Sequence, residues 1–168
     1  MSLRAISVLA LLSATALCSA SPVAAEPPSP YPVAQGNYTS PDDPGWVFFL
    51  SPAGYGGARD GAPVLQFGCG IGPDGTVGCD VVPDPTQVGD AALTVVPMGS
   101  NQTIAGPQQP GQYIHSDTLT FTRTVDVLPA GYQLVNAGAF CHVGEQGSVT
   151  CTSGDHGFTN NAIYGDTH

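Results

Sequence analysis

The sequence contains no lysine, and only two arginines, Arg59 and Arg123, follow residue 25. All thirteen acidic residues lie in that same part of the chain, which gives it a net charge of −11 with histidine neutral. Binding to phosphate backbones depends on Lys and Arg side chains. This charge balance excludes nucleic acids and anionic membrane surfaces as partners, and strong charge of one sign favours a monomer.

Long hydrophobic runs are also absent, except at the N-terminus. Arg4 is the only charged residue before Glu26, and an Ala/Leu-rich stretch fills residues 5–20. The stretch is too short, and too often interrupted by Ser and Thr, to span a bilayer comfortably, because a spanning helix needs about 20 apolar residues. The pattern is typical of a secretory signal peptide. Small residues predict cleavage after Ala25, with Ala20 as the alternative, and export as a secreted or cell-wall-associated protein.

Removal of residues 1–25 leaves a chain of ordinary length for one domain. Residues 26–45 carry proline too often for a helix or an inner strand. We interpret them as an extended, poorly ordered leader. Residues 46–168 are then a single domain.

No window of the domain shows a sustained helical period. Short β-like runs alternate with Gly, Pro, Asn and Asp, which predicts an all-β fold, a small antiparallel sandwich or an open barrel. The clearest run is 118–127, where apolar residues and threonines alternate. Residues 97–116, rich in Pro, Gln and Gly, are expected to form a large surface loop. The predicted strands are 46–50, 63–71, 76–82, 91–96, 118–127, 132–135, 139–143, 148–152 and 157–164.

The strongest signal is an internal repeat of eleven residues, C-x-(I/V)-G-x-x-G-(T/S)-V-x-C, which occurs at 69–79 and at 141–151. A three-residue hairpin loop ending in a left-handed glycine fits Gly75 in the first copy and Gly147 in the second. Counting outward from these turns makes the cysteines of each copy direct cross-strand partners, about 4.5 Å apart between Cα atoms. Of the three connectivities that four cysteines allow, we prefer disulfides within each copy. The predicted pairs are Cys69–Cys79 and Cys141–Cys151.

Two-residue alternation gives each predicted hairpin a core side and an outer side. The outer side of the first hairpin is nearly bare backbone at Gly70 and Gly78, which allows a ligand or another part of the chain to approach closely. We favour packing of the domain's own long loop there. In the second hairpin, His142 and Thr150 are the corresponding candidates for ligand contact, with His142 the stronger polar contributor.

Several short motifs resemble a family of secreted actinobacterial proteins of unknown function. They are the two cysteine units, Ser-Pro-Ala-Gly at 51–54, Leu-Pro-Ala-Gly at 128–131, and Gly-Asp-His-Gly-Phe at 154–158 followed by Tyr164. The resemblance spans about residues 46–164 and implies bacterial origin and export, not a chemistry. This sequence departs from the family pattern in an insertion at 55–63 and in Ala53, where the family has Ser.

Catalytic signatures are missing: the sequence has no G-x-S-x-G elbow, H-E-x-x-H helix, P-loop or dinucleotide-binding turn. His115 and Asp117 are the nearest candidates for a base and its orienting acid, while Ser116 between them points to the other face of a strand. Arg123 falls on the apolar side of the run 118–127. We interpret it as an arginine paired with a carboxylate, with ligand binding as the alternative.

A metal site would require four residues near the second hairpin to converge, and imidazole with carboxylate suits zinc. We favour a solvated polar face instead and expect no metal or cofactor. The four residues are His142, Glu145, Asp155 and His156.

The function that fits best is a non-catalytic secreted or cell-envelope module, structural or binding an extracellular protein or glycan. A secreted hydrolase using His115, Asp117, His142 or His156 is the first alternative. A secreted protease inhibitor is the second, because such inhibitors are also small and stapled by disulfides.

Overall fold

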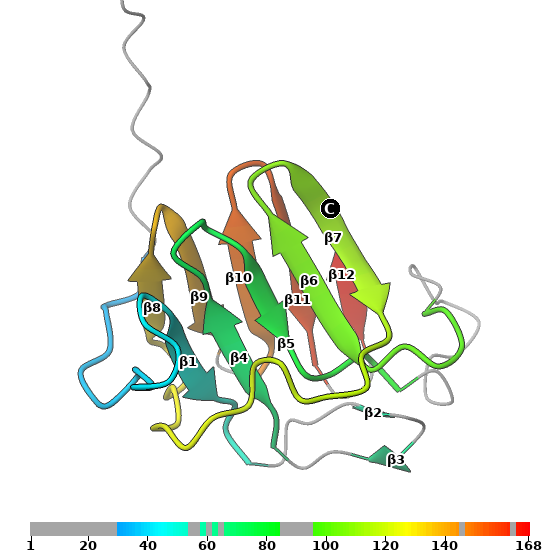
Figure 1. The fold of residues 1–168 in the computed structure, drawn as a ribbon, viewed down its shortest axis with the longest axis horizontal. Helices are drawn as coiled ribbons and strands as arrows, with labels where there is room; N and C mark the ends of the chain where they lie inside the picture. Colours follow the sequence, from blue (N-terminus) through cyan, green and yellow to red (C-terminus); the bar gives the residue numbers. More distant parts are fainter. Residues whose placement is uncertain are drawn as a thin grey trace, which may run out of the picture.

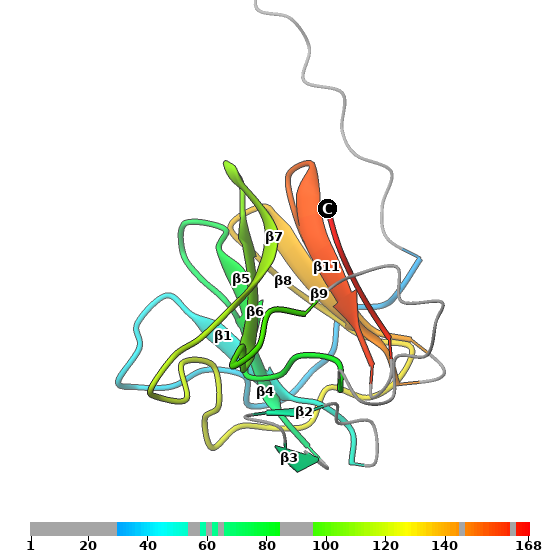
Figure 2. The same cartoon turned by 90° about the vertical axis from the view of Figure 1, so that its right-hand side faces the viewer.

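The computed structural model describes residues 30–53, 58–59, 62–63, 66–84, 96–144, 147–161 and 164–168. These residues form an all-β sandwich of two five-stranded antiparallel sheets, which lie as two separate layers in Figures 1 and 2. No segment of this part of the chain forms a helix with the length and apolarity needed to cross a membrane. The predicted signal peptide, most of the strand predicted at 91–96, and Glu145 lie outside the described residues.

The first sheet has the order β1-β4-β5-β6-β7. A two-stranded ribbon, β2 (Ala58–Arg59) and β3 (Ala62–Pro63), lies between β1 and β4 in the sequence. The strands of the sheet are β1 (Val47–Leu50), β4 (Gly68–Ile71), β5 (Val77–Cys79), β6 (Gln102–Gly106) and β7 (Gln109–Ile114).

The second sheet repeats this plan, because its strands are also hydrogen-bonded in chain order and its cysteine hairpin also supplies the second and third strands. The amide of Gly111 on β7 donates to the carbonyl of His168, 2.9 Å away, which links the two sheets at one side. The strands are β8 (Gln133–Asn136), β9 (Ala139–Val143), β10 (Val149–Ser153), β11 (His156–Asn160) and β12 (Gly165–Thr167).

The structure confirms the hairpin register and both disulfides. Cys69 pairs with Cys79 across β4 and β5, Cys141 pairs with Cys151 across β9 and β10, and the Cα atoms of each pair are 4.0 and 4.1 Å apart. The turn glycines have the expected positive φ, +83° at Gly75. All four cysteines are fully buried in one core with the Ile and Val residues beside them, so each hairpin presents its cysteine side to the other sheet.

The prediction of a strand at 118–127 is wrong, since this segment is a loop that crosses the outer face of the first sheet. Its backbone amides at Thr120, Phe121 and Thr122 do not join a ladder. They donate to the buried carboxylate of Asp80, at 3.0, 3.0 and 2.7 Å. A single side chain therefore satisfies the groups that a neighbouring strand would satisfy in a sheet. We call residues 116–127 the covering loop.

The prediction of a surface loop at 97–116 is also wrong, because β6 and β7 form a hairpin within these residues. The turn is at Pro107 and Gln108, where proline needs no ladder partner. Pro110 lies within β7, which is an edge strand of the sheet and so tolerates a residue without an amide hydrogen.

Residues 30–45 are held against the domain, in contrast to the loose leader expected. The amide of Ala34 donates to the carbonyl of Gln133 on β8, 2.9 Å away, and the amide of Phe48 donates to the carbonyl of Tyr38, 2.7 Å away. Ala34 and Tyr38 are buried in the core. The segment therefore protects the outer edges of β1 and β8, which would otherwise expose unpaired backbone groups.

Candidate functional site

The glycine side of the first hairpin is occupied by the protein itself. A Cβ atom at Gly78 would overlap the ring of Phe121 in the covering loop, and one at Gly70 would lie 2.8 Å from the ring of Phe48. Internal packing on these glycines agrees with the sequence analysis, but the segment that provides it is the covering loop and not the loop predicted at 97–116. Gly70 and Gly78 provide a flat floor for aromatic rings of the same chain, so this surface is not accessible to a ligand.

Arg123, also in the covering loop, is paired with a carboxylate as predicted, although it does not lie on a strand. Its Nε and Nη2 atoms donate to the two carboxylate oxygens of Asp43, at 2.7 and 3.1 Å. The guanidinium carbon lies 4.8 Å from the ring centre of Phe48. Hydrogen bonding from Arg123 lowers the pKa of Asp43, and the same bond raises the pKa of Arg123. The pair therefore stays charged and fixes residues 39–44 against the covering loop.

Residues 39–44 border two hollows. One, of about 360 Å³, is lined by polar side chains including Asn37, Asp42 and Arg123. The other, of about 430 Å³, lies between this segment and the end of β8, and we call it the Trp46 cleft. Its lining includes Pro41, Asp43, Trp46, Val47, Val135 and Asn136.

The Trp46 cleft combines apolar walls with polar groups that are held in place. The indole of Trp46, the single tryptophan of the chain, stacks on Phe48 with ring centres 5.5 Å apart. The amide nitrogen of Asn136 donates to the carbonyl of Gly45, 2.8 Å away. Val135 is half exposed at the rim. Pre-formed concave sites with this mixture of walls are where proteins usually bind small ligands or chain segments.

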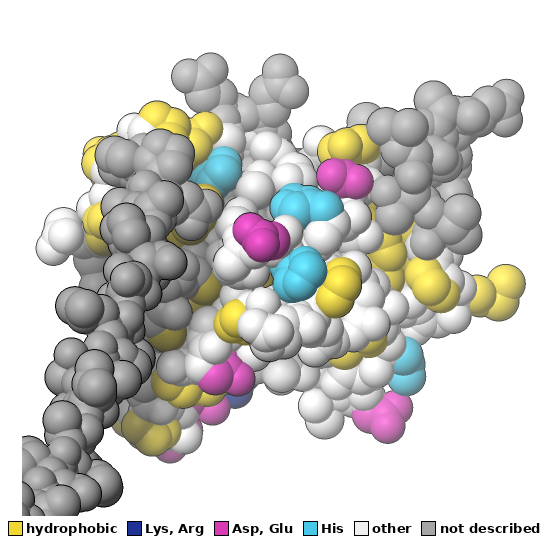
Figure 3. All heavy atoms as spheres, turned by 90° about the horizontal axis from the view of Figure 1, so that it is seen from above, with side chains coloured by type: hydrophobic (Ala, Val, Ile, Leu, Met, Phe, Trp, Pro, Cys, Tyr) yellow, Lys and Arg dark blue, Asp and Glu magenta, His cyan; other side chains and the backbone are white. Residues whose placement is uncertain are grey.

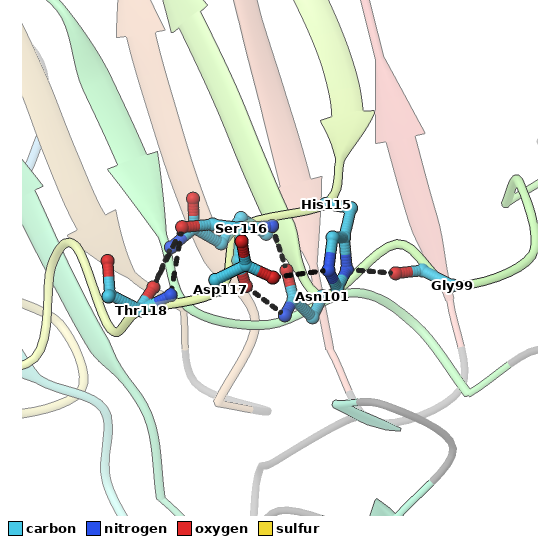
Figure 4. A network of polar contacts seen from close by, with 7 residues as sticks. Gly99, Asn101, His115, Ser116, Asp117 and Thr118 are labelled. Carbon is cyan, nitrogen blue, oxygen red and sulfur yellow. Dashed lines mark hydrogen bonds and ion pairs between the residues drawn. The ribbon is translucent and has the colours of Figure 1, made fainter.

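His115 and Asp117 come together as predicted, although they lie in the loop after β7 and not on one face of a strand (Figure 4). His115 Nε2 lies 3.2 Å from the Asp117 carboxylate, and its Nδ1 lies 2.8 Å from the carbonyl of Gly99. The hydroxyl of Ser116 donates to the carbonyl of Thr118, 2.9 Å away. Both ring nitrogens and this hydroxyl are thus engaged with other groups, and the arrangement does not place a nucleophile on the imidazole.

The neighbouring cavity is small and polar. It has a volume of about 90 Å³, and its lining includes Arg59, Asp80, Gln102, Asp117 and Leu119. Gln102 and Asp80 are bonded to each other at 2.7 Å and to the covering loop. These side chains hold the covering loop in place, which explains the polar lining of the cavity without a ligand.

His142 lies on the outer face of the second sheet, directly between Gln133 on β8 and Thr150 on β10. Its ring is half-buried and stacks on Tyr31 with ring centres 4.4 Å apart. Phe140, two residues earlier on β9, has its ring centre 6.3 Å from that of His142. The outer face of the second sheet therefore carries a row of aromatic rings beside its first two strands.

Burial lowers the pKa of His142 below 6.5. The unfolded chain therefore binds a proton at this histidine more readily than the folded chain does. As a result, the free energy of unfolding has its full value above about pH 6.5 and decreases as the pH falls below it. We expect acidification from about pH 7.5 to about pH 5.5 to lower the free energy of unfolding through this residue. The measurement is urea denaturation of the wild type and of His142→Phe at both pH values.

The phenylalanine variant should lose this part of the pH dependence. The control is Thr150→Val, which changes the cross-strand partner of His142 without removing a titratable group and should leave the difference between the two pH values as in the wild type. Equal pH dependence in the wild type and in His142→Phe would contradict the assignment.

The turn between β10 and β11 carries Asp155, and His156 begins β11. His156 is paired with Ser153 on β10, three residues along that strand from Thr150, the partner of His142. It also points to the opposite face of the sheet. Figure 3 shows histidine and acidic side chains near one another on the surface seen from above. Within the described ranges, however, no group of three or more His, Cys, Asp or Glu side chains is arranged to hold a metal ion.

Sequence reasoning missed the Trp46 cleft, because its walls come from segments about ninety residues apart in the chain. The sequence feature that could have indicated the cleft is the single tryptophan beside a Pro-Asp-Asp-Pro-Gly turn. Sequence reasoning also missed Tyr31, which belongs to the segment predicted as a leader. Searches against protein-family models, curated proteins and solved structures find no match to this chain.

Proposed function

We propose that this protein is a non-catalytic binding module, exported by its N-terminal signal and active outside the cell or in the cell envelope. Two buried disulfides are consistent with that location. The ligand, a glycan or an extended protein segment, occupies the Trp46 cleft. The acidic composition excludes nucleic acid as that ligand.

The observation that carries this proposal is the composition of the Trp46 cleft. Its volume of about 430 Å³ is within the range of ligand sites, about 300 to 1,000 Å³. Trp46 supplies a large amphipathic surface, and Asp43 and Asn136 are fixed polar groups bonded to Arg123 and to backbone carbonyls. No histidine is among the residues that line it. The hydroxyls of Thr39 and Ser40 also line it, but the Asp43 carboxylate beside them is bonded to Arg123, which lowers the pKa of Asp43 and makes it a weak base.

Trp46 provides a direct test, since it is the only tryptophan. We expect its fluorescence to change on titration with a ligand from panels of oligosaccharides and of extended peptides. Val135→Arg, at the rim of the cleft, should reduce the affinity by about tenfold or more. Leu119→Arg is the matched control, because Leu119 is similarly exposed, 44% against 50% for Val135, but lines the small cavity beside Asp117.

The outcome also separates binding from hydrolysis. Loss of binding in Leu119→Arg with wild-type binding in Val135→Arg would place the site beside His115 and contradict the proposal. Turnover of a bound oligosaccharide or peptide that is abolished by His115→Ala would favour the hydrolase instead.

A further inference from the structure

We propose that the ligand is a neutral polysaccharide, whose chain runs from the Trp46 cleft onto the outer face of the second sheet. This inference rests on the proposed function, because it extends the same site and names its ligand class. The path follows a strip of side chains across β8, β9 and the segment before β1. We call Val135, Phe140, His142 and Tyr31 the aromatic strip.

The aromatic strip is continuous with the cleft. Val135 lines the cleft and is also the direct cross-strand partner of Phe140. From Phe140 the row continues to His142, 6.3 Å away between ring centres, and then to Tyr31, 4.4 Å away. The three rings are within 20° of parallel from one neighbour to the next. A ligand that leaves the cleft at Val135 therefore meets a run of aromatic surface.

Threonines border this strip on the side of β10 and β11. Thr150 is paired with His142, Thr152 with Phe140, and Thr159 with Thr150. The hydroxyls of Thr150 and Thr159 share one hydrogen bond of 2.9 Å. Each hydroxyl has one proton and two acceptor positions, so the pair retains hydrogen-bonding capacity for a ligand. Sugar rings present C–H faces and hydroxyl edges, and this surface offers aromatic rings beside hydroxyls.

The charge of this surface decides the class of saccharide. Neither the aromatic strip nor the three threonines includes a Lys, Arg, Asp or Glu, although the chain as a whole has a net charge of −10. Among the described residues of this sheet, Asp166 is an acidic residue on the same face, and it is paired with Thr159 on the side away from β10. An acidic polysaccharide or a basic protein would find no opposite charge along the strip. A neutral polysaccharide needs no charged partner, so the absence of charged side chains along the strip does not weaken its binding.

The contrast between the two sheets supports this choice of face. In the first sheet the outer glycines lie under Phe121 and the covering loop. In the second sheet the positions equivalent to Gly68, Gly70 and Gly78 carry Phe140, His142 and Thr150, all partly exposed.

The test uses the mature chain with cellohexaose, N-acetylchitohexaose and mannohexaose, and with the disaccharide of each, as probes in calorimetry and Trp46 fluorescence. We expect one hexasaccharide to bind at least about tenfold more tightly than its disaccharide. Phe140→Ala should reduce the hexasaccharide affinity to that of the disaccharide and leave the disaccharide unchanged. Thr150→Arg removes no ring but places a large side chain beside the strip, and it should likewise reduce the hexasaccharide affinity to that of the disaccharide. The matched control is Gln112→Arg, at an exposed position of β7 in the other sheet.

Three results would overturn the inference: equal affinity for the long and short saccharides, wild-type binding by folded Phe140→Ala and Thr150→Arg, or tighter binding of polygalacturonate than of every neutral probe. A change in Trp46 fluorescence with a peptide but with no saccharide would overturn the inference and leave the proposed function intact. Absence of a fluorescence change with any probe contradicts the proposed function itself.

Discussion

Replacement of Gly78 by valine should lower the free energy of unfolding by about 3 kcal/mol or more, at the upper end of the cost of overpacking. A Cβ atom at this position would overlap the ring of Phe121, which lies directly over the glycine floor. The ring cannot shift freely, since the amide of Phe121 is bonded to Asp80. Steric conflict therefore displaces the covering loop, and urea denaturation with the disulfides intact measures the loss.

A double-mutant cycle identifies the cause of this loss. Phe121→Ala alone should cost about 3 to 5 kcal/mol, as for other buried aromatic residues. In that background Gly78→Val should cost much less than in the wild type, because the conflicting ring is gone. Gly106→Ala is the control, as a Cβ atom there has its nearest neighbour at 3.7 Å. Additive effects of the two substitutions would contradict the packing explanation.

Asp80→Asn should cost about 3 kcal/mol and detach the covering loop. The carboxylate is 1% exposed and accepts five hydrogen bonds, from three backbone amides, the hydroxyl of Thr122 and the side chain of Gln102. Asparagine keeps one acceptor oxygen and turns an NH₂ group toward some of those donors. Buried donors that lose their acceptor are expensive to leave unpaired.

Detachment of the loop has its own signature, because Trp46 and Phe121 lie in contact, with ring centres 6.1 Å apart. Trp46 fluorescence of Asp80→Asn should shift to the red below the main unfolding transition. Asp117→Asn changes an aspartate whose side chain is 97% exposed and should match the wild type. A single transition at wild-type stability in Asp80→Asn would show that the carboxylate does not hold the loop.

The cysteine hairpins could be predicted because every signal that specifies them is local. The turn glycines, the alternation and the cysteine spacing all lie within eleven residues, and the structure confirms the register that follows from them. The covering loop could not be predicted in this way. Its threonines and apolar residues alternate like those of a strand, but its amides are satisfied by Asp80, some forty residues away.

The candidate site was only partly predictable, for a similar reason. His142 and Thr150 follow from hairpin register, and the structure places them as cross-strand partners on the outer face. Tyr31 completes the aromatic strip from a segment about one hundred residues earlier, and its proline-rich surroundings gave no indication of that contact. Trp46 and Val135 likewise line one cleft only because the segment before β1 lies near the end of β8. Side chains that converge from distant segments leave no periodic pattern in the sequence.

The arrangement of each sheet in chain order has a consequence for how the protein folds. In each sheet, strands that pair with each other are also neighbours in the chain order of that sheet's strands. Most pairs therefore form by closing only a short loop. The exceptions are the longer segments before β4 and before β6. Each pair of thiols meets as soon as its own hairpin turns, before the partner sheet is present. Oxidation should therefore reach the native pairing directly, and each half of the chain can acquire its bond independently of the other.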